Sequence, residues 1–209
     1  EDEAFTLRSR AATSQGEWQV NSTGYVRRTA ASPRPVPGVP PVHRWQEATT
    51  RRIFGGARLT GGPRWQWPRL EVEHEGRVWD RMTLPPAFAA DVEVFDLHPA
   101  LLDVATMGAA RTMRTESVPH TYDCIRIFAG LTPDVLALAF ARDAGTSTAT
   151  DVTITDLDGT TLVEIEDVTG ELLAWLRPHG HGRGSVVIAR PDRFVYGAVP
   201  GSELSAATR

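Results

Sequence analysis

The sequence predicts an α+β fold in which an antiparallel sheet wraps around one central helix. Residues 99–113 carry the strongest helical pattern, because Pro99 suits a first turn and Ala, Leu and Met fill the body. Four strand patterns follow, at residues 118–128, 135–142, 149–156 and 161–168. The turn "DLDG" joins the last two. A helix followed by such a meander favours a sheet packed on a helix.

Two hairpins are predicted before the helix. Residues 4–10 and 17–28 are short β-like runs on either side of a polar turn. Residues 69–74 and 77–84 alternate apolar and polar side chains around Glu75-Gly76. Between the hairpins, "VHRWQEATTRRIF" at residues 42–54 is a candidate short helix, and a glycine-rich loop follows it.

The domain boundaries follow from composition. "TAASPRPVPGVPP", residues 29–41, has five prolines in thirteen positions, which predicts an extended linker. We therefore divide the chain into residues 1–28, the linker, a main domain at 42–170 and a C-terminal extension at 171–209. In the extension we expect a helical turn, a flexible loop and a hairpin over residues 185–198 that turns at Pro191-Asp192.

Charge and cysteine content exclude several classes of protein. The 22 basic and 26 acidic residues are mixed along the chain, so no basic face for nucleic acid or a membrane surface is predicted. A single cysteine permits neither an internal disulfide nor a thiolate metal cluster. The tract "HGHGRG" lacks a third ligand, and we predict no metal site.

The start of the chain and its apolar segments bear on location. No signal peptide or membrane span is visible, so we expect a soluble, cytoplasmic protein. The chain begins without Met and almost directly in a strand pattern. We therefore expect it to be part of a larger polypeptide.

One carboxylate stands out inside the predicted helix. Asp103 lies among Leu101, Leu102, Val104 and Ala105. Apolar surroundings favour the neutral form of a carboxylic acid, which suits a general acid. An Asp near the start of a helix can also be a capping or dipole-compensating residue without any catalytic role.

The segments around Asp103 resemble the dehydratase domains of polyketide synthases. "LHPALLD" is similar to their second catalytic motif, and "GGPRWQW" to the segment ahead of that helix. "VPHTYDCIRIFAGL" and "VTITDLDGTTLVEIEDVTGELL" resemble the strands that follow, and "GEWQVNSTGYV" the end of the preceding half. The resemblance covers residues 4–170. It implies a double hotdog fold, of which residues 1–28 would close the first hotdog and residues 42–170 would form the second.

The resemblance also implies an activity in polyketide biosynthesis: dehydration of a β-hydroxyacyl chain tethered to an acyl carrier protein. A His on the first half would remove the α-proton, and Asp103 would protonate the departing hydroxyl. No cofactor is implied, because the thioester already acidifies the α-carbon. The other candidate site residues divide into the tunnel mouth, its lining and a residue expected to be structural. These are Gly62, Pro63 and Gln66 at the mouth, Leu97, Leu102 and Met107 in the lining, and His98 before the helix proline.

Two departures from the family pattern keep other functions open. Met107 stands where the family has Gln or His one turn after the Asp, and it offers no useful hydrogen bond. The family's base motif, His-x-x-x-Gly-x-x-x-x-Pro, does not occur in the sequence. The alternatives are a non-catalytic structural or substrate-holding module and a related double-bond isomerase or cyclase. In each case we expect pairing with another hotdog half or a homodimer.

The tail carries a second, shorter resemblance. "AWLRPHGHGRGSVVIARPDRFVYGAV" is similar to the C-terminal end of aromatic-ring flavoprotein hydroxylases. No Gly-x-Gly-x-x-Gly flavin site accompanies it, so no FAD is predicted. A piece of a hydroxylase assembly is therefore a third interpretation, resting on the tail alone.

Overall fold

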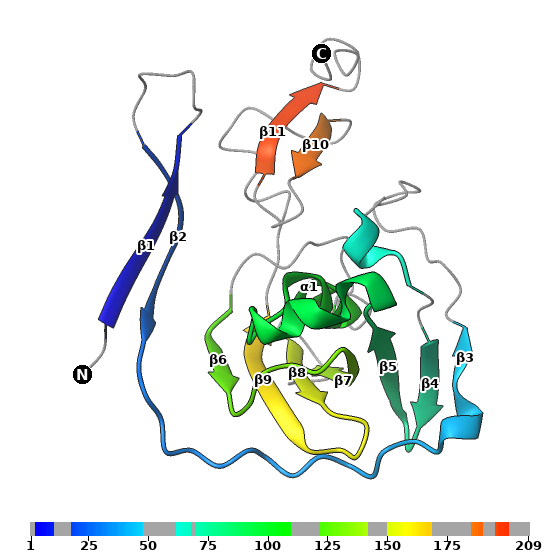
Figure 1. Cartoon of the computed structure of the whole chain (residues 1–209). Helices are drawn as coiled ribbons and strands as arrows, with labels where there is room; N and C mark the ends of the chain where they lie inside the picture. Colours follow the sequence, from blue (N-terminus) through cyan, green and yellow to red (C-terminus); the bar gives the residue numbers. More distant parts are fainter. Residues whose placement is uncertain are drawn as a thin grey trace. The chain divides into compact units, whose positions relative to one another are not determined.

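The computed structural model describes residues 3–10, 18–47, 62–67, 70–109, 122–141, 150–168, 185–189 and 195–200. The chain divides into two compact units, Glu1–Ser32 and Pro33–Arg209. Figure 1 shows the helices and strands of both. None of the helices described is long and apolar enough to cross a membrane.

The first unit is an antiparallel hairpin of β1 (Glu3–Ser9) and β2 (Gln19–Val26). Phe5 pairs with Gly24, and its ring lies so close that a Cβ at Gly24 would be 2.6 Å from Phe5 Cε1. Phe5, Leu7, Tyr25 and Val26 are exposed. A two-stranded hairpin is at best marginally stable in water. Its assignment as the closing hairpin of a preceding hotdog half stays a prediction.

The second unit is built on a seven-stranded sheet of order β3-β4-β5-β7-β8-β9-β6. Every neighbouring pair is antiparallel. The strands are β3 (Gln46–Glu47), β4 (Leu70–His74), β5 (Arg77–Thr83), β6 (Cys124–Ile127), β7 (Asp134–Ala141), β8 (Thr150–Thr155) and β9 (Thr161–Val168). The predicted second hairpin is confirmed, and β7, β8 and β9 form a meander as predicted. The strand β6 does not continue this meander: β6 pairs with β9 at the edge of the sheet, and β7 pairs with β5.

Local chemistry fixes two of the hairpin turns. Glu75 and Gly76 both have positive φ, 51° and 71°, the backbone that a tight β4–β5 turn needs. In the β8–β9 turn, Asp156 Oδ1 accepts hydrogen bonds from the main-chain N–H groups of Asp158 at 3.0 Å and Thr160 at 2.8 Å. The Asp156 carboxylate thus accepts from two main-chain N–H groups that the turn would otherwise leave to water.

Helix α1 (Pro99–Ala109) packs against β5, β7 and β8 and covers one face of the sheet, here called the inner face (Figure 1). Leu101 and Ala105 lie one helical turn apart and are both buried against it. The sheet residues of this core point inward at alternate positions. They include Met82, Val135, Ala137, Val152, Ile154, Val163 and Ile165. The predicted helix on an antiparallel sheet is confirmed, and residues 110–113 lie outside the described part.

The opposite, outer face is covered by residues 33–41, here called the strap. Val36 and Val39 of the strap pack against a second core, whose largest member is the fully buried Trp79. The strap passes so close to the β8–β9 turn that a Cβ at Gly159 would be 2.7 Å from Val39 Cγ2. The proline-rich segment, predicted as a linker, therefore packs on the sheet from residue 33 onward.

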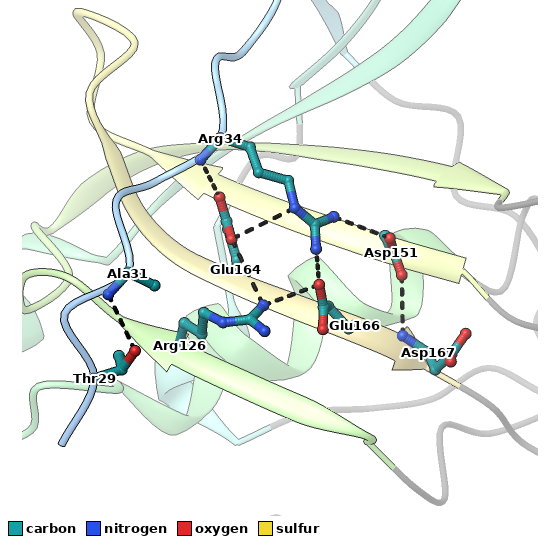
Figure 2. A network of polar contacts seen from close by, with 8 residues as sticks. All are labelled: Thr29, Ala31, Arg34, Arg126, Asp151, Glu164, Glu166 and Asp167. Carbon is teal, nitrogen blue, oxygen red and sulfur yellow. Dashed lines mark hydrogen bonds and ion pairs between the residues drawn. The ribbon is translucent and has the colours of Figure 1, made fainter. Parts of the chain in front are cut away.

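Arg34 fastens the strap to the charged half of the outer face (Figure 2). Its guanidinium pairs with Glu166 and lies 3.4 Å from Asp151 Oδ2. Its main-chain N–H donates to Glu164 Oε1 at 2.6 Å. All three carboxylates are buried, and Arg126 of β6 adds a second cation, 2.9 Å from Glu166 Oε1. Buried carboxylates need such partners because water does not reach them.

The structure changes the predictions for two other segments. The helix expected at residues 42–54 is wrong where it is described: η1 (Val42–Arg44) is a single 3-10 turn, followed by β3. Trp45 packs into the outer core, and strand pairing of Gln46 with Glu71 takes the place of helix formation. The strand expected at 118–128 begins only at Cys124, with residues 118–121 outside the described part.

The expected tail hairpin is present. β10 (Ser185–Ala189) and β11 (Val195–Pro200) pair antiparallel, slightly beyond the predicted end. The predicted turn at Pro191-Asp192 and the "HGHGRG" tract lie outside the described residues.

The strap predicts a stability effect. Arg34→Ala should lower the free energy of unfolding by about 1–2 kcal/mol, because three buried carboxylates lose a partner while Arg126 still serves two of them. Urea denaturation measures it. Arg44→Ala, at an exposed position just after the strap, is the matched control. Equal stability of the two variants would show that Arg34 does not hold the strap.

Candidate functional site

The candidate site lies where α1 meets a short turn of the glycine-rich segment, η2 (Pro63–Trp65). Asp103 is the fifth residue of α1, beyond the first turn, and it is half-buried. The indole N–H of Trp65 donates to Asp103 Oδ2 at 2.8 Å. Asp103 thus faces a neighbouring segment and is not part of the helix's first turn, which weakens its interpretation as a cap.

Helical periodicity explains why Asp103 points that way. Leu101 and Ala105 occupy the face buried against the sheet. Asp103 and Met107 share a neighbouring face, four residues apart, and both are half-buried. The carboxylate therefore lies at the rim of the apolar core and not within it.

Residues of the predicted tunnel mouth all lie in or beside η2. Gly62 precedes the turn and its carbonyl accepts from Trp65 N at 2.9 Å, while Gln66 N donates to Pro63 O at 3.2 Å. Pro63 and Gln66 are exposed. The structure thus brings the η2 segment next to Asp103 through Trp65.

Two of the three predicted lining residues contact the core on the inner face of the sheet. Leu97 and Leu102 are partly buried and pack against it. Met107 is half-buried one turn after Asp103 and supplies no hydrogen bond to it. Their contact with a substrate stays a prediction.

His98 has the surroundings of a structural residue. Its ring is 1% exposed and meets Phe95 edge-on, with the ring centroids 6.2 Å apart. Nε2 lies 3.4 Å from Asp91 Oδ2, and among the described residues Nδ1 has no hydrogen-bond partner. The His98 carbonyl accepts the N–H of Leu102 at 3.0 Å, which starts the helix.

An ion pair connects the η2 segment to the residues ahead of α1. Arg64 Nε lies 2.5 Å from Asp91 Oδ2 on η3 (Pro86–Glu93), and its guanidinium stacks 4.4 Å from the Phe88 ring centroid. The hydrogen bond from Arg64 lowers the pKa of the Asp91 carboxyl below its ordinary value; burial opposes the effect, and His98 adds to it. Arg64 and Asp91 therefore join η2 to η3, next to the start of α1.

A half-buried tyrosine, Tyr122, contacts the helix through Thr106. Tyr122 hydrogen-bonds to Thr106, and burial raises the pKa of its phenol above the ordinary value despite that bond. The hydroxyl of the fully buried Thr106 lies 3.0 Å from the Leu102 carbonyl and 3.1 Å from that of Asp103. Tyr122 and Thr106 therefore connect the segment just before β6 to the turn of α1 that carries Asp103.

Four residues of this region were not predicted from the sequence: Trp65, Arg64, Asp91 and Tyr122. Trp65 was within the quoted "GGPRWQW", but its indole N–H is a donor that all six tryptophans of the chain share, so the sequence does not single it out as the partner of Asp103. Among the described residues, no three His, Cys, Asp or Glu side chains are arranged to hold a metal ion.

Solved structures similar to this chain include dehydratase domains of polyketide synthases. One comes from work on the borrelidin and fluvirucin synthases, with 22% identity, a TM-score of 0.61, and coverage of 83% of this chain and 62% of that one. The bifunctional dehydratase-cyclase domain in ambruticin biosynthesis has 18% identity and a TM-score of 0.64, with coverage of 81% of this chain and 63% of that one. A dehydratase domain of a trans-AT polyketide synthase from Brevibacillus brevis has 20% identity and a TM-score of 0.58, with coverage of 82% of this chain and 65% of that one.

These likenesses establish the fold. The chain is an α+β hotdog protein whose antiparallel sheet and helix match the double hotdogs of polyketide synthase dehydratases. It spans less than two thirds of the length of these structures. A family model, the HcaD C-terminal domain, matches residues 129–209. No curated protein matches the sequence. The tail's resemblance to flavoprotein hydroxylases stays a prediction.

Asp91 predicts a pH dependence of stability. Its folded pKa lies below the unfolded value of about 4, so its contribution is present above that value and is lost as the pH falls through the folded pKa. Between about pH 6 and pH 3 the unmodified protein should lose more stability than Asp91→Asn. Urea unfolding at both pH values measures this, with exposed Glu93→Gln as control. Equal losses in the unmodified protein and Asp91→Asn would contradict it.

Proposed function

We propose that this chain is the acid-bearing half of a polyketide synthase-type dehydratase that acts on a β-hydroxyacyl thioester carried by an acyl carrier protein. The observation that carries the proposal is the placement of Asp103. Its helix is fixed on the sheet by Leu101 and Ala105, and Trp65 orients its carboxyl group by a 2.8 Å hydrogen bond. A general acid needs such a fixed position relative to the group it protonates.

The proposed reaction balances without an oxidant or reductant. A base takes the α-proton, and the C–H electron pair forms the Cα–Cβ double bond. The Cβ–O bond breaks, its oxygen takes the proton of Asp103, and water leaves. Asp103 ends as a carboxylate and the base ends protonated, so proton transfer through solvent restores both.

The motif that carries the catalytic base in the family does not occur in this sequence. None of its six histidines lies in the family's base motif, and His98 is buried in a structural role. We therefore propose that a second hotdog half supplies it. The carrier protein and this pairing partner are both parts of the proposal.

The strongest alternative is a non-catalytic module that holds the growing chain. Met107, with no useful hydrogen bond to offer, favours it, while the oriented Asp103 favours the enzyme. Double-bond migration and ring closure would use the same acid. Product analysis separates them from dehydration, because only dehydration removes a water molecule from the substrate.

Asp103→Asn tests the proposal. The substitution keeps the shape and an oxygen acceptor for Trp65 but removes the donated proton, so turnover should fall roughly 10²–10⁴-fold with little change in melting temperature. The assay follows dehydration of a carrier-bound β-hydroxyacyl thioester by the polypeptide in the form that the cell makes. Asp158→Asn, in the exposed β8–β9 turn, is the control and should keep full activity.

Two outcomes would overturn the proposal. Unchanged turnover in Asp103→Asn would remove Asp103 from the mechanism. An inactive unmodified protein would reject the dehydratase function and leave the holding module as the better interpretation.

A further inference from the structure

We infer that Trp65 is the positioning residue for Asp103: its indole N–H fixes which carboxyl oxygen carries the acidic proton. This inference rests on the proposed function. The two residues are 38 positions apart, and the contact is made between η2 and α1. It is therefore a product of the fold and not of local helix chemistry.

The direction of this hydrogen bond limits the states of the acid. An indole N–H donates and never accepts. Asp103 Oδ2 must therefore accept whether the group is ionised or neutral. The carbonyl oxygen of a carboxylic acid is a better acceptor than its hydroxyl oxygen, so in the neutral form the hydrogen bond from Trp65 favours the proton on Oδ1. The contact thus selects one of the two oxygens as the donor.

The turn that carries Trp65 is itself held in place. Its neighbour Arg64 is bound to Asp91 at 2.5 Å and stacks on Phe88. Asp91 also approaches His98, directly before α1. The turn that carries the indole is therefore tied to η3 and, through Asp91, to the start of α1, as a precise catalytic geometry requires.

Trp65 also supplies what the helix itself lacks. The position one turn after Asp103 shares its face and is the natural place for a polar partner on the same helix. Met107 fills it and offers no useful hydrogen bond. Trp65 on η2 gives the acid one hydrogen bond from outside the helix.

Trp65→Phe tests the inference because it removes the N–H and keeps a flat aromatic ring in the contact. A misoriented acid slows the proton-transfer step more than it weakens binding of the thioester. We expect kcat to fall about 10-fold with KM changed less than about 2-fold. Trp67→Phe is the matched control: it removes an indole N–H from the same segment, and its side chain packs on the core.

A spectroscopic readout tests the contact without catalysis. The Trp65 indole N–H resonance is assigned as the one lost in Trp65→Phe. It should move in Asp103→Ala, which removes the acceptor, and stay in place in Asp158→Asn. The Trp67 indole resonance should not move in either variant.

The outcomes separate this inference from the proposed function. An active protein whose kcat is the same in Trp65→Phe and Trp67→Phe would overturn the positioning role. So would an unmoved Trp65 resonance in Asp103→Ala. An inactive unmodified protein would reject the dehydratase function, and the resonance alone would then decide whether Trp65 fixes Asp103. If the melting temperature of Trp65→Phe falls so far that the variant is unfolded at the assay temperature, its loss of activity is explained by stability, and the role of Trp65 is merely structural.

Discussion

The packing of α1 on the inner face of the sheet is the constraint from which the candidate site follows. Leu101 and Ala105 must be buried against inward-pointing strand residues such as Val135 and Ile154, and this fixes the rotation of the helix about its axis. With 3.6 residues per turn, Asp103 then lies at the rim of the helix–sheet contact. A carboxylate in the middle of an apolar segment is thus accommodated without being placed in the core, where ionisation would cost several kcal/mol.

The outer face solves a different problem, because a sheet that carries a helix on one side still exposes the other. The strap covers it in two ways. Val36 and Val39 bury the apolar half around Trp79, and Arg34 neutralises the carboxylates of β8 and β9. Each face of the sheet is thus packed against another element, the inner face against α1 and the outer face against the strap.

Regular elements could be predicted because their signals are local. β9 has its predicted bounds, 161–168, and α1 begins at the predicted Pro99. The failures have a common cause in long-range contacts. In the described part of the helix expected at residues 42–54, a 3-10 turn is followed by strand pairing with β4, which no local pattern encodes. The packing of the strap could not be foreseen from a proline-rich stretch without periodicity.

The same distinction applies to the candidate site. Asp103 was identifiable from an unusual residue in an apolar helix together with a family resemblance. Its partner Trp65 was not, because the contact joins two segments 38 residues apart and depends on how η2 folds back. The apposition of Arg64, Asp91 and His98 is equally a tertiary result, formed by charges that look unremarkable in the sequence.

The most direct test of the account is a crystal structure of the protein with a β-hydroxyacyl pantetheine amide, a stable analogue of the thioester. We expect the analogue's hydroxyl to lie about 3 Å from a carboxyl oxygen of Asp103, with the Trp65 indole still bound to the other oxygen. A hydroxyl bound away from Asp103, or an acyl chain seated on the outer face in place of the strap, would contradict it.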